Sequence, residues 1–175
     1  YKMDMNKGTK KELATGLNED QYVASEDGHL VAYEKEDPSK SKSVTVMNLE
    51  TDQEYEVTCK DGECIKPLGF MDGDFVYGVA KTEEVGTTLS GAQVIPMYKV
   101  EITSSKDKVI KTYEQSGIYM LSATFEDNMI TLDRAVNGGD IYTGTAQDFI
   151  TSSDEARESN IYVQTYTTDL DETQF

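Results

Sequence analysis

The two cysteines have the spacing that comes closest to a chemical site. Cys59 and Cys64 flank a short segment whose centre, Asp-Gly at residues 61–62, is typical of a turn. A tight hairpin would place the two thiols opposite each other, so the sequence is compatible with a disulfide and equally with two free thiols. Two thiolates without a nearby histidine fall short of the four ligands of a structural zinc site, so we expect no metal there.

The single histidine, His29, is the next candidate for chemistry. It directly follows the turn-like pair Asp-Gly at residues 27–28, and we interpret it as a half-exposed turn residue rather than a catalytic base. No serine stands in a Gly-x-Ser-x-Gly elbow, and neither common glycine-rich phosphate loop is present. We therefore predict no catalytic residue and no bound cofactor, and expect a protein that is not an enzyme.

Carboxylates dominate the charge of the chain. It has 33 acidic against 16 basic residues and a net charge of −17, which makes nucleic acid and anionic lipid poor partners. The acidity either keeps an exposed protein soluble or recruits cations or basic proteins. Asp72 and Asp74, and the acidic group at residues 169–172, could contact calcium, but no EF-hand spacing is present. We favour solvated acidic turns, with a calcium-dependent surface domain as an alternative.

An acidic turn that leads into a short apolar strand occurs three times in the sequence. The turns lie at residues 27–28, 72–73 and 127–128, so they are 45 and 55 residues apart. Asp-Gly and Asp-Asn tolerate the positive φ angles of tight turns, and the apolar runs behind them predict strands. Leu30–Tyr33 and Phe75–Ala80 are apolar at successive positions, which is typical of strands covered on both faces.

The strand pattern divides residues 1–168 into repeat units, followed by an exit linker at 169–175. Residues 1–15 predict a hairpin that forms the outer half of a unit. Residues 21–58 and 65–114 each predict four strands, a buried inner pair and a more polar outer pair, and residues 118–168 a degenerate third unit. In that third unit we expect outer strands at 141–144 and 161–167, separated by a short helix or loop at 146–159.

The second unit also contains a long loop, residues 81–91. Loops of this length are uncommon and are either tolerated surface insertions or functional segments. If the loop binds a ligand, its candidate contact residues are Lys81, Glu83, Glu84, Thr87 and Thr88.

A single four-stranded sheet cannot hide both faces of its inner strands, whereas radially stacked sheets can. The sequence DGHLVAY at residues 27–33, followed by VTVMNLETD at 44–52, resembles the repeat of the TolB-like β-propeller family. The resemblance covers about residues 1–145 and implies an all-β fold of antiparallel, four-stranded blades. A closed propeller needs about four to eight blades, so we expect a partial propeller within a larger polypeptide, with a β-sandwich as the alternative.

These observations predict a non-enzymatic scaffold or binding module of an exported bacterial-type protein, located outside the cell or at its surface. Its ligand would be a protein, a peptide or a glycan bound at the mouth of the central channel. An accessory propeller domain of a larger enzyme, such as a peptidase or glycosidase, is the alternative. The sequence has no run of 18 apolar residues, so we expect no membrane insertion.

Overall fold

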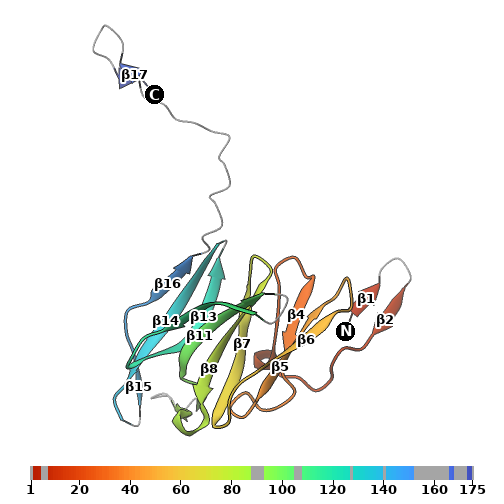
Figure 1. The fold of residues 1–175 in the computed structure, drawn as a ribbon, viewed down its shortest axis with the longest axis horizontal. Helices are drawn as coiled ribbons and strands as arrows, with labels where there is room; N and C mark the ends of the chain where they lie inside the picture. Colours follow the sequence, from red (N-terminus) through yellow and green to blue (C-terminus); the bar gives the residue numbers. More distant parts are fainter. Residues whose placement is uncertain are drawn as a thin grey trace.

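The computed structural model describes residues 2–4, 8–87, 93–104, 108–126, 128–139, 141–151, 166–167 and 173–174. These residues form antiparallel sheets that stand side by side (Figure 1). The described chain adds two short 3-10 helices, η1 (Glu19–Gln21) and η2 (Thr82–Glu84). The predicted all-β, antiparallel fold class is confirmed, and the arrangement is consistent with a partial propeller or a β-sandwich.

Sheet 1 has four strands and lies within residues 21–58. Its order follows the sequence: β3 (Tyr22–Ala24), β4 (Leu30–Tyr33), β5 (Ser43–Asn48) and β6 (Glu54–Thr58). In β5, Val44 and Val46 are buried and Thr45 between them is half-buried, which is the alternation expected of a strand.

Sheet 2 contains β7 (Glu63–Met71), β8 (Asp74–Lys81), β11 (Met97–Ser104) and β12 (Lys108–Glu114). β7 and β8 are joined by the two residues Asp72 and Gly73, whose φ angles are 52° and 85°. Positive φ at both central positions is characteristic of a type I′ hairpin turn, which matches the twist of the strands. The aspartate and glycine therefore fix the register of the longest hairpin in this sheet.

Sheet 3 contains β13 (Ile118–Glu126), β14 (Met129–Asn137), β15 (Tyr142–Gly144) and β16 (Asp148–Thr151). β15 and β16 both pair with β14, along its second and first halves respectively. The outer position of this sheet is thus shared by two short strands.

One expectation for the third unit is wrong. Residues 146–159 were expected to form a helix or loop, yet β16 lies in this range because Ile150, 3% exposed, fills the core beside β14. Of the outer strand predicted at 161–167, residues 161–165 lie outside the described residues. Its last residues form β17 (Tyr166–Thr167), which pairs with β18 (Thr173–Gln174), inside the predicted exit linker.

Sheets 2 and 3 are not fully separate sheets. A single bridge between Met97 of β11 and Met120 of β13 joins them into one curled, eight-stranded sheet. Both methionine side chains are completely buried, so the bridge lies inside the core. We keep the names sheet 2 and sheet 3 for its two halves.

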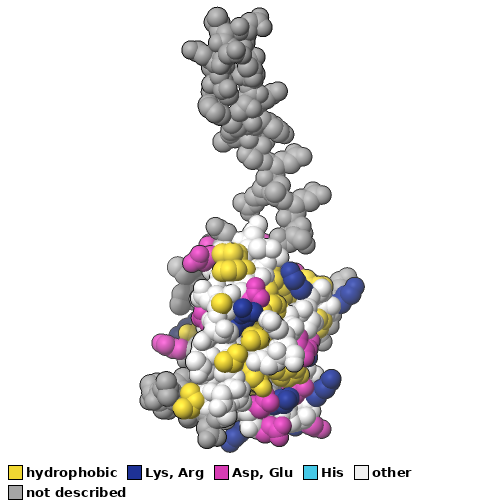
Figure 2. Space-filling model, turned by 90° about the vertical axis from the view of Figure 1, so that its left-hand side faces the viewer, with side chains coloured by type: hydrophobic (Ala, Val, Ile, Leu, Met, Phe, Trp, Pro, Cys, Tyr) yellow, Lys and Arg dark blue, Asp and Glu magenta, His cyan; other side chains and the backbone are white. Residues whose placement is uncertain are grey.

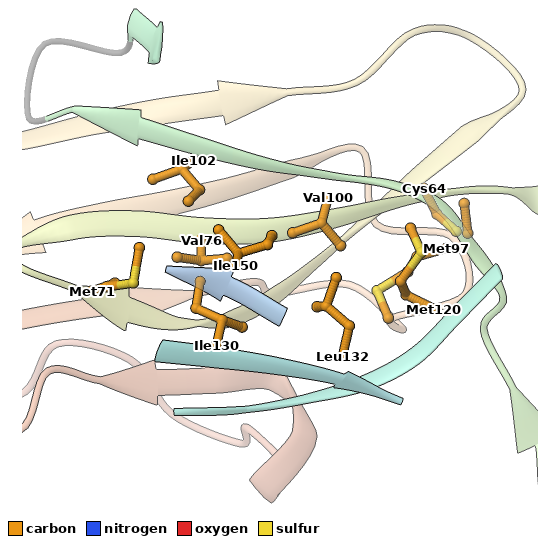
Figure 3. Close-up of a cluster of buried hydrophobic side chains, with 11 residues drawn as sticks. Cys64, Met71, Val76, Met97, Val100, Ile102, Met120, Ile130, Leu132 and Ile150 are labelled. Carbon is orange, nitrogen blue, oxygen red and sulfur yellow. The ribbon is translucent and has the colours of Figure 1, made fainter. Parts of the chain in front are cut away.

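The core consists of two main layers of side chains, one on each face of sheet 2. Figure 3 shows the layer between sheets 2 and 3, where Val76 and Val100 oppose Ile130 and Leu132. The second layer lies between sheets 1 and 2 and contains Phe75, Tyr77 and Val79 of β8, with valines of sheet 1. Alternate residues of β8 therefore enter different layers, as predicted for residues 75–80.

The first strands of the three sheets lie next to one another, β3 beside β7 and β7 beside β13. At Gly69 of β7, an added Cβ would lie 2.6 Å from the ring of Phe125 on β13. Only glycine fits between these two strands without a displacement of the ring.

The expectation that both faces are covered holds less well for β4 than for β8. Leu30 and Val31 of β4 are only half-buried.

The N-terminal residues form a separate hairpin of β1 (Lys2–Asp4) and β2 (Thr9–Lys11). The hairpin is tied to sheet 1 by Lys2, whose Nζ lies 2.9 Å from Asp52 Oδ1. Residues 13–17 then lie against the face of sheet 1 that points away from sheet 2. The end of the stack is therefore covered by the start of the chain.

Candidate functional site at the convergent turns

A hollow of about 750 Å³ opens where the three repeat turns meet. Each repeat contributes to it, because the inner hairpins all turn at the same end of the stack. Its lining consists of residues from the first turn, the second turn and the third: Ser25, Glu26, Asp27, Phe70, Met71, Asp72, Gly73 and Asn128. Ligand sites in proteins are concave, so this hollow is the first candidate for a binding site.

The first turn is held by its own side chains. Ser25 Oγ donates to Asp27 Oδ1 at 2.6 Å, and the same oxygen accepts the backbone N–H of His29 at 2.9 Å. The Leu30 N–H donates to Ser25 Oγ at 2.9 Å, which closes the loop before β4 begins. These bonds lower the pKa of Asp27, first through Ser25 and then through the His29 N–H, so the carboxylate stays charged.

The hollow is acidic and its described lining contains no lysine or arginine. Glu26, Asp27 and Asp72 supply its carboxylates, while Phe70 and Met71 are its apolar lining residues. Negative charge beside apolar side chains suits a ligand that carries both cationic and apolar groups.

His29 lies beside the first turn, close to the side chain of Glu50. Its Nδ1 is 3.3 Å from Glu50 Oε1, and both side chains are about half exposed or more. This geometry agrees with the interpretation of His29 as a turn residue.

A narrower cleft of about 370 Å³ adjoins the hollow, between sheets 1 and 2, and shares Gly73 with it. Leu30, Val46 and Tyr55 form its apolar wall, and Asn48, Gln53 and Glu54 its polar wall. An extended segment could therefore contact the hollow and this cleft together.

The described residues offer no evident site for a metal ion. They contain no group of three or more His, Cys, Asp or Glu side chains arranged to hold one. The acidic hollow is thus a surface of like charges without convergent ligands, and no cofactor is indicated.

The predicted ligand loop is docked onto sheet 3 where it leaves sheet 2. Lys81 Nζ pairs with Glu84 Oε1 at 3.1 Å, and the Glu84 backbone carbonyl accepts the hydroxyl of Tyr142 at 3.0 Å. Glu83 is exposed, Thr87 belongs to β9 (Gly86–Thr87), and Thr88 lies outside the described residues. β9 pairs with β10 (Gln93–Val94).

The strand after this loop, β10, contributes to a small third core. Val94 packs with Ala135 and Tyr142 on the face of sheet 3 that points away from sheet 2. An added Cβ on Gly86 would lie 3.1 Å from the Tyr142 ring, so β9 is pressed close to that ring. The described part of the loop therefore has a structural role, while ligand binding by its residues stays a prediction.

Figure 2 shows the side of the molecule on which sheet 3 lies, where hydrophobic patches alternate with polar and charged side chains. Phe149 of β16 is an exposed apolar residue of sheet 3, and Ile141, just before β15, is also exposed. Elsewhere on this face, Ser122 Oγ donates to Asp133, and Gln147 donates to the other oxygen of the same carboxylate. The outward face is therefore mixed.

Both cysteines are free thiols in the structure. Cys64 is 1% exposed and belongs to the layer between sheets 2 and 3, whereas Cys59 packs against the layer between sheets 1 and 2. The two side chains thus enter different layers rather than meeting across a hairpin. Burial raises the pKa of Cys64 to about 11, which makes this thiol a poor nucleophile.

The sequence analysis did not identify two polar side chains that have notable surroundings in the structure. Arg134 of β14 donates to Asp148, Tyr113 and Gln115, and so links sheet 3 to the end of β12. Glu34 is a carboxylate that is only 1% exposed. A charged residue directly after the apolar run 30–33 was the signal available, but its burial depends on contacts with β7 that the local sequence does not reveal.

Comparison with known proteins places the fold but no activity. The fold is similar to that of a protein assigned as a conserved lipoprotein from Clostridium novyi NT. The two structures align with a TM-score of 0.53 and 12% sequence identity, over 81% of this chain and 93% of the other.

Other comparisons give no assignment. No family model matches the chain, and no curated protein matches it. The resemblance to TolB-like repeats therefore stays a prediction. Among the described residues, no helix has the length and apolar character needed to cross a membrane.

Proposed function

We propose that this chain is a non-enzymatic binding module of an exported protein, and that it binds an extended segment of a partner protein in the hollow at the convergent turns. The partner segment carries lysine or arginine next to apolar side chains. The observation that carries the proposal is the convergence of three equivalent turns on one acidic hollow that is also lined by apolar residues.

The cellular location of the protein is part of the same proposal. An all-β fold similar to that of a protein assigned as a lipoprotein fits a chain that works outside the cell or at its surface. The net charge of −17 would keep such a surface soluble and would steer basic partners toward it. A partial TolB-like propeller within a larger polypeptide is the architecture that we propose for the whole.

The test measures the binding of fluorescent peptides by anisotropy. One peptide alternates lysine with leucine, one replaces lysine with glutamine, and one replaces leucine with serine. The double variant Asp27→Asn, Asp72→Asn removes two charges from the hollow while asparagine keeps the turn geometry. The double variant Glu12→Gln, Glu36→Gln removes two exposed charges elsewhere and serves as the control.

We expect the wild type to prefer the lysine–leucine peptide over both others. The hollow variant should bind it about tenfold more weakly, and the control variant should lose less than about twofold. Equal weakening by the two variants would show a non-specific charge effect and would contradict the site. Equal binding of all three peptides would contradict the ligand class.

A further inference from the structure

Glu34 is buried without a partner at the junction between sheet 1 and β7. It follows β4 directly, and its backbone N–H donates to the Gln21 carbonyl at 2.9 Å. The side chain is 1% exposed, and within the described chain neither carboxylate oxygen has a hydrogen-bond partner. Native proteins rarely leave a buried carboxylate unpaired, because an ionised one is costly to desolvate.

The surrounding groups do not compensate this charge. The Ser41 hydroxyl lies nearby and lowers the pKa of Glu34 somewhat, but it donates its proton to the Ser43 carbonyl at 3.0 Å. Lys66 of β7 attracts the carboxylate, although the two form no ion pair in the described chain, while Asp20 and Asp37 repel it.

Burial is the largest effect and raises the pKa of Glu34 to about 7. The neighbouring Cys64 thiol, with a pKa of about 11, stays neutral at this pH. Glu34 is therefore expected to change its charge near neutral pH.

The segment beside Glu34 holds the two sheets together. Residues 37–42 are the second part of the connection between β4 and β5, and the Ile65 N–H of β7 donates to the Ser41 carbonyl at 2.9 Å. The Cys59 N–H donates to the Lys42 carbonyl at 3.1 Å and extends the pairing of β5 with β6 within sheet 1. The bond between Ile65 and Ser41 therefore ties the segment to β7 at this end, and the cleft of about 370 Å³ lies between the same two sheets at the other.

We propose that Glu34 is a proton-operated latch: it is neutral while segment 37–42 is closed on β7, and loss of its proton to solvent loosens that segment. A carboxylate formed in the closed junction is stabilised by water only if the segment moves outward. The proposal concerns regulation of the fold and is independent of the binding function proposed above.

The direction of the pH dependence follows from linkage. The pKa of Glu34 in the closed state, about 7, lies above its unperturbed value of 4.5. The group therefore costs nothing below pH 4.5, its ionisation increasingly opposes closure as the pH rises, and the cost is complete above pH 7. Between about pH 5.5 and 8 the opening equilibrium should rise roughly twentyfold.

The test is amide hydrogen exchange at residues 41 and 65, measured at pH 5.5 and pH 8 and corrected for the intrinsic exchange rates. Glu34→Gln keeps the shape of the side chain and removes the titration. Glu36→Gln removes one exposed carboxylate two residues away and is the matched control.

We expect the protection of the Ile65 amide to fall roughly twentyfold at pH 8 in the wild type and in Glu36→Gln, and to stay constant in Glu34→Gln. An equal fall in all three proteins would overturn the proposal. Should Glu34→Gln not fold, the carboxyl carbon of Glu34 is titrated by NMR in the wild type. A midpoint near 7 supports the latch, and one below 5 refutes it.

Discussion

Two strands of sheet 2 differ sharply in burial although they belong to the same sheet. In β8, all six residues from Phe75 to Ala80 are buried. In β12, six of the seven residues are exposed, including Val109 and Ile110. β8 lies between the layers formed with sheets 1 and 3, whereas β12 lies at the edge of sheet 2, beyond β11.

The burial of a strand's side chains in this molecule therefore depends on how close the strand lies to the inner strands. Strand propensity alone does not determine it. β12 has the β-branched and aromatic residues of a good strand, yet no neighbouring sheet covers most of it. Charged residues such as Lys108 and Lys111 suit such an edge, because they discourage pairing with other chains.

The largest expected effect comes from removing a side chain of β8. Phe75 is completely buried, and its ring lies 5.5 Å from that of Phe70 and 5.6 Å from that of Tyr77. Phe75→Ala should lower the free energy of unfolding by about 3–5 kcal/mol, because it leaves a cavity between sheets 1 and 2.

The matched change in β12 is Ile110→Ala, which should alter the free energy of unfolding by no more than about 0.5 kcal/mol. Urea denaturation of both variants measures the contrast. Similar losses of unfolding free energy in the two variants would mean that β8 and β12 lie in similar environments.

A smaller effect should follow from adding one methyl group to β8. An added Cβ on Gly78 would lie 1.9 Å from Met97 Sδ and 2.6 Å from its Cγ. Gly78→Ala should cost about 1–3 kcal/mol, because Met97 is completely buried and has little room to move.

Gly144 of β15 provides the control for this prediction, since an added Cβ there would meet no atom within 4 Å. Gly144→Ala should be neutral or slightly stabilising, as alanine restricts the unfolded chain. Thermal unfolding of the two variants measures the difference in stability. A neutral effect of Gly78→Ala would show that the layer between sheets 2 and 3 is packed more loosely than described.

The sequence was most informative where local chemistry determines the structure. Asp72 and Gly73 predicted a tight hairpin because few residue types accept positive φ, and the apolar run behind them predicted a strand covered on both faces. The strands of sheet 1 follow from the same local signals, namely alternation and turn residues.

Long-range contacts account for what the sequence could not predict. The short strand β16 contains only two apolar residues, and it forms because β14 offers a free edge and a space that Ile150 fills. The docking of the 81–91 loop depends on Tyr142, which lies far away in the chain.

The candidate site was predicted only in part. The three acidic turns were evident from the sequence, but their convergence on one hollow requires the stacking of the sheets. The burial of Glu34 is likewise a consequence of β7 closing over the end of β4.

The central claim is that sheet 2 is covered on both faces by sheets 1 and 3, and amide hydrogen exchange along β8 and β12 tests it most directly. The account predicts that the amides of residues 75–80 exchange only through global unfolding, with the free energy found by urea denaturation. Amides of residues 108–114 should exchange faster, through local opening of the edge. Equally fast exchange in the two strands would contradict the claim.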